Sequence, residues 1–139
     1  MLAAAAAGGG LFVLVRTSNP GAADLLDLET DEGPLHERVA ALVAAERRLE
    51  GESGLSAMGA VVGATAPGRL ARLRELMPRS IILLPGVGAQ GASAAALAPA
   101  LGDHPASILV PVSRGISAAP DPSAAAIALR DQLWSLARR

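Results

Sequence analysis

The chain has no cysteine and no lysine among its 139 residues, and each absence excludes a class of chemistry. Without cysteine there is no disulfide framework, no thiolate zinc site and no cysteine nucleophile, and nothing indicates an oxidising compartment. All 12 basic residues are arginine, so this chain alone supports no mechanism that needs a lysine amine. No metal site is predicted.

Aromatic residues are almost absent as well, since Phe12 and Trp134 are the only ones. Two isolated rings cannot form a platform on which nucleobases stack. The 12 basic and 13 acidic residues give a net charge of −1, which provides no basic field for phosphodiester backbones or anionic lipids. Nucleic acids and membrane surfaces are therefore not expected as partners.

The chain starts with an apolar, small-residue segment that ends in three glycines. This segment lacks the positive charge of a signal peptide, and the apolar run at residues 11–15 is too short to span a bilayer. We interpret residues 1–10 as the remnant of a preceding helix, so that the chain begins inside a fold.

Four short apolar runs predict β-strands at residues 11–15, 58–62, 81–84 and 108–110. The runs are continuous rather than alternating, which is typical of strands buried on both faces of a parallel sheet. We therefore expect all four strands to be buried.

A turn rich in glycine, proline, serine or threonine follows each run, and a helical pattern follows each turn. Residues that favour helix starts mark these helices: Pro34, Thr65, Pro67, Ser93, Asp121 and Pro122. Gly102 is expected to end the third helix. Apolar residues at helical spacing are expected to face the core: Leu35, Val39, Leu42, Val43, Leu49, Leu70, Leu73, Met77, Ile127, Leu133 and Leu136.

Several polar residues are expected to lie in solvent. Residues 29–33 are predicted to form a surface loop before the first helix. His36 and His104 have no neighbouring carboxylate pattern, and Asp24 and Asp27 belong to an acidic stretch. All four side chains are therefore predicted to be exposed.

Strand followed by helix, four times over, predicts an α/β fold with right-handed βαβ units and a parallel sheet. A complete (β/α)8 TIM barrel has about 250 residues, so four units in 139 residues correspond to about half a barrel. We predict one partial-barrel domain over residues 1–139, with the four βα units in residues 11–139. A half-barrel leaves two unpaired sheet edges and an exposed inner face, so it should need the missing half.

The loop after the first predicted strand places Ser18 and Asn19 at the mouth of the sheet. Barrel enzymes carry their chemistry in such loops. As an alternative, these side chains make only the local backbone bonds of a strand-to-helix turn.

The loop after the third predicted strand is rich in glycine. Gly86, Gly88 and Gly91 let the backbone approach an anion closely, and Gln90 adds a side-chain donor and acceptor. The spacing matches G-x-G-x-x-G formally, but residues 108–111 carry no acidic residue at the end of the next strand, so dinucleotide binding is not expected.

Arg114 and Gly115 follow the fourth predicted strand. A guanidinium at this position can bind a phosphate through two parallel hydrogen bonds, and the adjacent glycine can add its N–H. Barrels often bind phosphate between the loops after strands seven and eight, which would be the last two strands here. As an alternative, Arg114 pairs with a neighbouring carboxylate.

Taken in order, residues 11–21, 59–65, 84–91 and 113–116 resemble orotidine 5′-monophosphate decarboxylase, in particular its longer bacterial subfamily. The resemblance covers this chain almost entirely, but only the C-terminal half of that enzyme. It implies a cytoplasmic, cofactor-free lyase with a TIM-barrel fold, which converts orotidine monophosphate (OMP) to uridine monophosphate (UMP) in pyrimidine synthesis. It also implies a homodimer for the full-length enzyme.

The resemblance implies substrate-binding roles for five residues. Ser18 would hydrogen-bond the pyrimidine ring, and Pro85 would pack beside the base. Gln90 would reach toward the phosphate and the ring carbonyl, while Arg114 and the Gly115 backbone would hold the phosphate. Binding energy from the remote phosphate can then lower the barrier at the reacting carbon.

The catalytic Asp-x-Lys-x-x-Asp array of that family belongs to its N-terminal half, and this chain has no lysine. We therefore assign no catalytic residue to the chain and expect it to be inactive alone, as a truncated product or one with a misassigned start. Two alternatives stay open. One is another phosphate-binding barrel of the same superfamily, such as a hexulose-phosphate synthase. The other is a non-catalytic half-barrel that binds a nucleotide or pairs with a partner chain.

Overall fold

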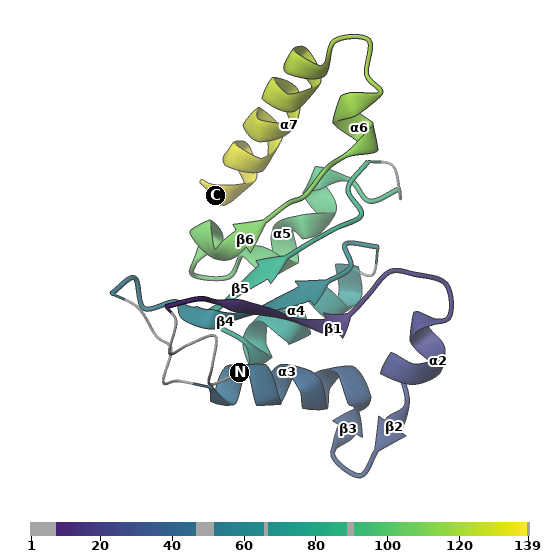
Figure 1. Ribbon diagram of the computed structural model, residues 1–139, viewed down its shortest axis with the longest axis vertical. Coiled ribbons are helices and arrows are strands. Elements are labelled where there is room, and N and C mark those ends of the chain that lie inside the picture. Colours follow the sequence, from purple (N-terminus) through teal and green to yellow (C-terminus); the bar gives the residue numbers. More distant parts are fainter. Residues whose placement is uncertain (1–7, 47–51, 66, 89–90, 139) are drawn as a thin grey trace.

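A parallel four-stranded sheet forms the centre of the molecule, with the strand order β1-β4-β5-β6 (Figure 1). The computed structural model describes residues 8–46, 52–65, 67–88 and 91–138. The strands are β1 (Leu11–Arg16), β4 (Ser56–Val62), β5 (Ser80–Leu83) and β6 (Ile108–Leu109). The predicted strands and their parallel, sequential order are therefore confirmed. The predicted helix remnant at residues 1–10 lies mostly outside the described residues.

Helices follow the strands as the sequence predicts. They are α2 (Ala22–Leu26), α3 (Leu35–Ala45), α4 (Pro67–Leu76), η1 (Ala94–Leu97), α5 (Ala98–Leu101), η2 (Pro105–Ser107), α6 (Arg114–Ser117) and α7 (Pro122–Ala137). Two predicted caps are present: Ser93 accepts a hydrogen bond from the Ala96 N–H, and Asp121 accepts one from the Ala124 N–H. No helix among the described residues is long and apolar enough to cross a membrane.

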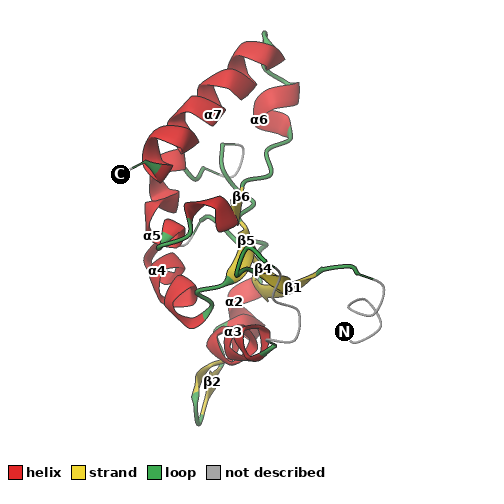
Figure 2. Ribbon diagram, turned by 90° about the vertical axis from the view of Figure 1, so that its left-hand side faces the viewer, coloured by secondary structure: helices red, strands yellow, loops and turns green. Residues whose placement is uncertain are grey.

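The helices lie on one side of the sheet, and the apolar core fills the space between the two layers (Figure 2). Every second residue of a strand points to this side. The largest buried apolar residues are Met58, Leu70, Leu73, Met77, Ile82, Leu84 and Leu97. The predicted core positions of the second helix are therefore confirmed.

The opposite side of the sheet, which we call the bare face, is apolar and uncovered. Phe12 and Leu14 of β1 are 42% and 63% exposed, and Leu109 of β6 is 46% exposed. The prediction that the strands are buried on both faces is wrong for the outer strands β1 and β6, because helices cover only one side of the sheet. The central strands β4 and β5 have no exposed residue. The continuous apolar pattern of the strands nevertheless indicates that the bare face needs to be covered by other protein.

Two local predictions are also wrong. Residues 29–33 lie at the surface before the first long helix as predicted, but they belong to a small antiparallel hairpin of β2 (Glu29–Thr30) and β3 (Gly33–Pro34) rather than to a loop without strands. Leu42 is 70% exposed and Ile127 is 48% exposed, since the surfaces that their helices bury are narrower than the apolar pattern. Leu49 lies outside the described residues.

Candidate functional site

The loops that follow the four strands are aligned at one end of the sheet. Hydrogen bonds continue the parallel pairing beyond the strands: the Gly63 N–H donates to the Arg16 carbonyl at 2.7 Å, and the Ala64 N–H donates to the Pro85 carbonyl at 2.9 Å. Strand β5 pairs directly with β6. The loops therefore gather at the carboxyl ends of the strands, where barrel enzymes place their chemistry.

Ser18 lies where the loop after β1 meets the loop after β4. A Cβ atom on Gly63 would lie 2.7 Å from the Ser18 Cβ, so only glycine permits this approach. Thr17 Oγ1 donates to Asn19 Oδ1 at 2.5 Å, and Asn19 Nδ2 donates to the Pro20 carbonyl at 3.0 Å. Local bonds of the kind expected for a strand-to-helix turn are thus present for Thr17 and Asn19.

The glycines after β5 are needed for the path of the loop. Gly86, Gly88 and Gly91 have φ values of 119°, 79° and 89°, a region that other residues rarely adopt. The Gly88 N–H donates to the Ala92 carbonyl at 2.9 Å, and the Gly91 N–H donates to the Gly88 carbonyl at 2.8 Å. These two donors shape the loop itself. Gln90 lies outside the described residues.

Arg114 is the first residue of α6, residues 110–113 separate it from the end of β6, and its side chain is exposed. Within the described part of the chain, no carboxylate lies within ion-pair distance of its guanidinium. The N–H groups of Arg114 and Gly115 have no acceptor inside the helix, because they belong to its first turn.

A hollow of about 260 Å³ lies between the loop after β5, the loop after β6 and α7, and Arg114 is not among the residues that line it. Its wall includes Val87 and Gly88 from one loop and Val112 and Gly115 from the other. The structure thus places Ser18, Pro85, Arg114 and Gly115 in loops at the same end of the sheet. No group of three metal-ligating side chains is present among the described residues.

An ionic cluster at this end of the sheet was not predicted. Arg16 Nε and Nη2 donate to Asp27 Oδ1 and Oδ2 at 2.8 and 3.1 Å, and Arg69 Nη1 pairs with Oδ1. The ring of His36 is buried, with Nδ1 2.7 Å from the Leu26 carbonyl and 3.3 Å from Asp27 Oδ1. The predictions that Asp27 and His36 are solvated are therefore wrong, whereas His104 and Asp24 are exposed as expected.

The hydrogen bonds from Arg16, together with Arg69, lower the pKa of Asp27 below its ordinary value of 3.8, against the opposing effect of burial. One sequence signal could have revealed the cluster. Arg16 directly ends a run of five apolar residues, and a cation that is partly buried at the end of such a run needs a partner.

Arg74 is a second buried cation that the sequence analysis missed. It is 5% exposed, and its guanidinium donates to the carbonyls of Ala100, Met77 and Ser80 at 2.9, 2.8 and 3.0 Å and to Ser107 Oγ at 3.0 Å. Burial lowers the pKa of Arg74 to about 10, so the group stays charged at neutral pH. It stabilises the end of the sheet opposite the candidate site.

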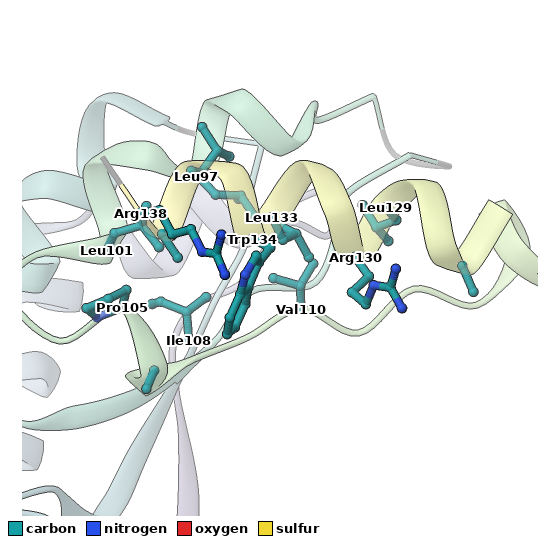
Figure 3. A pocket seen from close by; sticks show the side chains of 14 residues that line it. Leu97, Leu101, Pro105, Ile108, Val110, Leu129, Arg130, Leu133, Trp134 and Arg138 are labelled. Atoms are coloured by element: carbon teal, nitrogen blue, oxygen red, sulfur yellow. The ribbon is translucent and has the colours of Figure 1, made fainter. Parts of the chain in front are cut away.

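A separate apolar cleft of about 550 Å³ lies between α7 and β6 (Figure 3). Leu133 and Trp134 of α7 line it from one side, and Ile108 and Val110 line it from the strand side. Arg138 lies 5.1 Å above the Trp134 ring. None of the predicted site residues lines this cleft.

The sequence and the fold agree with those of one family. A family model described as "Orotidine 5'-phosphate decarboxylase / HUMPS family" matches residues 1–129. The chain belongs to this family. The resemblance inferred from the four loops is therefore confirmed.

Curated relatives of the family extend beyond this chain. The orotidine 5′-phosphate decarboxylase of Halorubrum lacusprofundi is 51% identical over 113 residues, which are 77% of this chain and 39% of the relative. That of Deinococcus radiodurans is 46% identical over 136 residues, which are 91% of this chain and 47% of the relative. The chain spans less than half the length of either decarboxylase.

A solved structure of Leishmania donovani OMP decarboxylase has the same fold. It matches with a TM-score of 0.76 and 32% identity, over 94% of this chain and 48% of that one. Structures of this decarboxylase family are TIM barrels, and this chain corresponds to about half of one. The predicted partial-barrel fold is therefore confirmed.

Proposed function

We propose that this chain is the C-terminal half of an orotidine 5′-phosphate decarboxylase and holds the base and the phosphate of OMP. The observation that carries this proposal is the placement of Arg114. It begins α6 in the segment that follows β6, and β6 pairs with β5, the strand that leads into the glycine-rich loop. No described carboxylate neutralises it. An exposed guanidinium in this position suits a phosphate monoester.

The proposed roles follow the loops. Arg114 and the Gly115 backbone hold the phosphate, with Gln90 at the rim. Ser18 hydrogen-bonds the pyrimidine ring, and Pro85 packs beside it. Binding energy from these contacts, which are remote from the reacting carbon, can be used to lower the barrier there.

The chemical step requires a group that this chain does not contain. The bond between the pyrimidine ring and its carboxylate breaks, carbon dioxide leaves, and a proton takes its place on the ring carbon. The family's proton donor is a lysine, and this chain has none. We therefore expect the isolated chain to be inactive and the lysine to come from an N-terminal barrel half. No cofactor is required, and a cytoplasmic location goes with this role.

The surfaces left open on this chain suit such a partner half. The bare face presents Phe12, Leu14 and Leu109, and strands β1 and β6 end the described sheet at either side. Unpaired strand edges and an uncovered apolar face are unfavourable in water. An N-terminal half-barrel would pair with both edges and cover this face. The complete enzyme is proposed to form a homodimer.

The experiment joins this chain to the N-terminal half of the Deinococcus radiodurans relative and measures conversion of OMP to UMP. We expect turnover by the joined protein and none by the chain alone. The variant Arg114→Ala should abolish most of this activity. Arg72→Ala, which removes an arginine 53% exposed on α4, serves as the control and should leave it unchanged. Absence of turnover in the joined protein, despite correct folding, would contradict the proposal.

A second candidate is a non-catalytic half-barrel that binds nucleotides, which the complete absence of lysine favours. The same joined protein separates the two functions. UMP binding without any turnover of OMP would favour the binding module.

A further inference from the structure

We propose that Asp27 is a positioning residue for residues 17–26, which contain Ser18 and which we call the base-binding loop. Its carboxylate links the two ends of this loop and connects the loop to α4. The inference deepens the proposed function. It rests on that function only for the identity of the ligand.

The first tie closes the loop on itself. Arg16 is the last residue of β1, and Asp27 follows α2, so the loop that contains Ser18 lies between them. Two nitrogens of the Arg16 guanidinium donate to the two Asp27 oxygens at 2.8 and 3.1 Å, a bidentate geometry that restricts orientation as well as distance. The third nitrogen donates to the carbonyl of Thr17, the first residue of the loop.

The second tie joins neighbouring elements. Arg69 belongs to the first turns of α4, just after the loop that contains Gly63, and its Nη1 pairs with the same Asp27 oxygen that accepts from Arg16 Nε. Gly63 in turn packs against Ser18. One carboxylate therefore connects the base-binding loop to the segment on which Ser18 rests.

Asp27 acts through these arginines rather than on a ligand. Its side chain is 21% exposed, and both of its oxygens accept hydrogen bonds from guanidinium groups. His36 also holds the backbone next to Asp27 in place, because its Nδ1 donates to the carbonyl of Leu26, the residue before Asp27. Loss of the carboxylate would leave Arg16 and Arg69 close together without a counter-charge.

The first experiment measures amide hydrogen exchange in the chain as it stands. Asp27→Asn keeps the size of the side chain and removes its charge. We expect exchange in residues 17–26 to increase about tenfold, the scale of one charge-assisted hydrogen bond. Asp27→Glu should restore part of the protection. Asp24→Asn, which changes an exposed acid on α2, is the matched control and should leave exchange unchanged.

The second experiment uses the chain joined to the N-terminal half. Asp27→Asn should lower kcat/KM for OMP about tenfold while inhibition by inorganic phosphate keeps its strength. Arg114→Ala should weaken phosphate inhibition. A purely structural role for Asp27 would instead weaken both ligands together.

The outcomes separate this inference from the proposed function. Unchanged exchange in residues 17–26, or exchange raised equally over the whole chain, would overturn the positioning role. Equal loss of OMP and phosphate binding would also overturn it. If the joined protein never turns over OMP while exchange rises only in residues 17–26, the proposed function is wrong, but the positioning of this loop by Asp27 is supported.

Discussion

Three arginines show how surroundings decide the role of a single residue type. Arg74 is buried and donates to carbonyls and a hydroxyl, so its guanidinium stabilises the fold. Arg16 is held by Asp27 and shapes a loop. Arg114 is exposed and has no carboxylate partner among the described residues. Of these three arginines, Arg114 is the one that we propose to hold a phosphate.

Replacement of Arg114 tests the proposed phosphate site. In the chain joined to an N-terminal half, Arg114→Ala should weaken UMP binding by roughly 1.5–3 kcal/mol, the value of a hydrogen bond to a charged group. Calorimetry with UMP and with uridine measures the effect. Since uridine has no phosphate, its affinity should change little. Equal weakening of the two ligands would remove the phosphate assignment.

Replacement of Arg74 tests a structural role. Arg74→Met keeps most of the side-chain volume but leaves buried carbonyls without donors, each of which costs about 1–3 kcal/mol. The free energy of unfolding should therefore fall by about 3 kcal/mol or more, as measured in urea. The comparison variant is Arg79→Met, which replaces an exposed arginine in the turn that follows α4. A loss no greater than that of Arg79→Met would contradict the role.

The lowered pKa of Asp27 predicts a dependence of stability on pH. The ion pairs contribute fully above the ordinary pKa of 3.8, and the contribution is lost as the pH falls through the lowered pKa of the folded state. The stability difference between the wild type and Asp27→Asn should therefore be constant from about pH 7 to pH 5 and shrink below pH 4. Urea titrations at each pH measure it. A difference that stays constant below about pH 4 would contradict the prediction.

At the scale of elements, local signals at helix starts and strand runs agree with the structure. Ser93 and Asp121 are caps in the sequence pattern and accept the expected hydrogen bonds. Caps and buried runs are local properties, because their partners lie within a few residues. The short hairpin of β2 and β3 has no such signal, since each of its strands has two residues.

The cap of α7 offers a test at this scale. Asp121 Oδ1 accepts a hydrogen bond from the Ala124 N–H at 3.0 Å. Asp121→Ala should lower the free energy of unfolding by about 1 kcal/mol. Asp121→Asn should keep most of the stabilisation that the cap provides, because asparagine is also a good cap residue. Thermal unfolding followed by circular dichroism measures both variants. Equal losses would show that the charge at the helix start matters more than the hydrogen bond.

At the scale of the whole molecule, the chain is an open part of a closed architecture. Helices cover one face of its sheet, and the other face and the cleft beside β6 remain apolar and accessible (Figures 2 and 3). A complete barrel has no sheet edges and fills its interior with side chains. The stability of this chain should therefore depend on what covers these surfaces.

Addition of the N-terminal half of a relative should raise the Tm of this chain, because a partner that binds only the folded state stabilises it, and the rise should grow with the logarithm of the concentration of that half. Differential scanning calorimetry of the mixture measures the shift. Leu14→Asp, on the bare face, should reduce it. Leu42→Asp, an exposed position on α3, should not. A Tm that is independent of the added half would contradict the proposed partner.

The sequence by itself determined the four strands, the main helix starts, the parallel order and the family, because each depends on local spacing or on motifs of adjacent residues. Only the tertiary structure decided which polar residues are buried and which apolar residues are exposed. Asp27 meets Arg69, and Arg74 meets Ser107, across 42 and 33 positions of the chain, and no local pattern specifies such pairs. Likewise, the exposure of Phe12 depends on which side of the sheet the helices cover, which is a property of the assembled layers rather than of the strand.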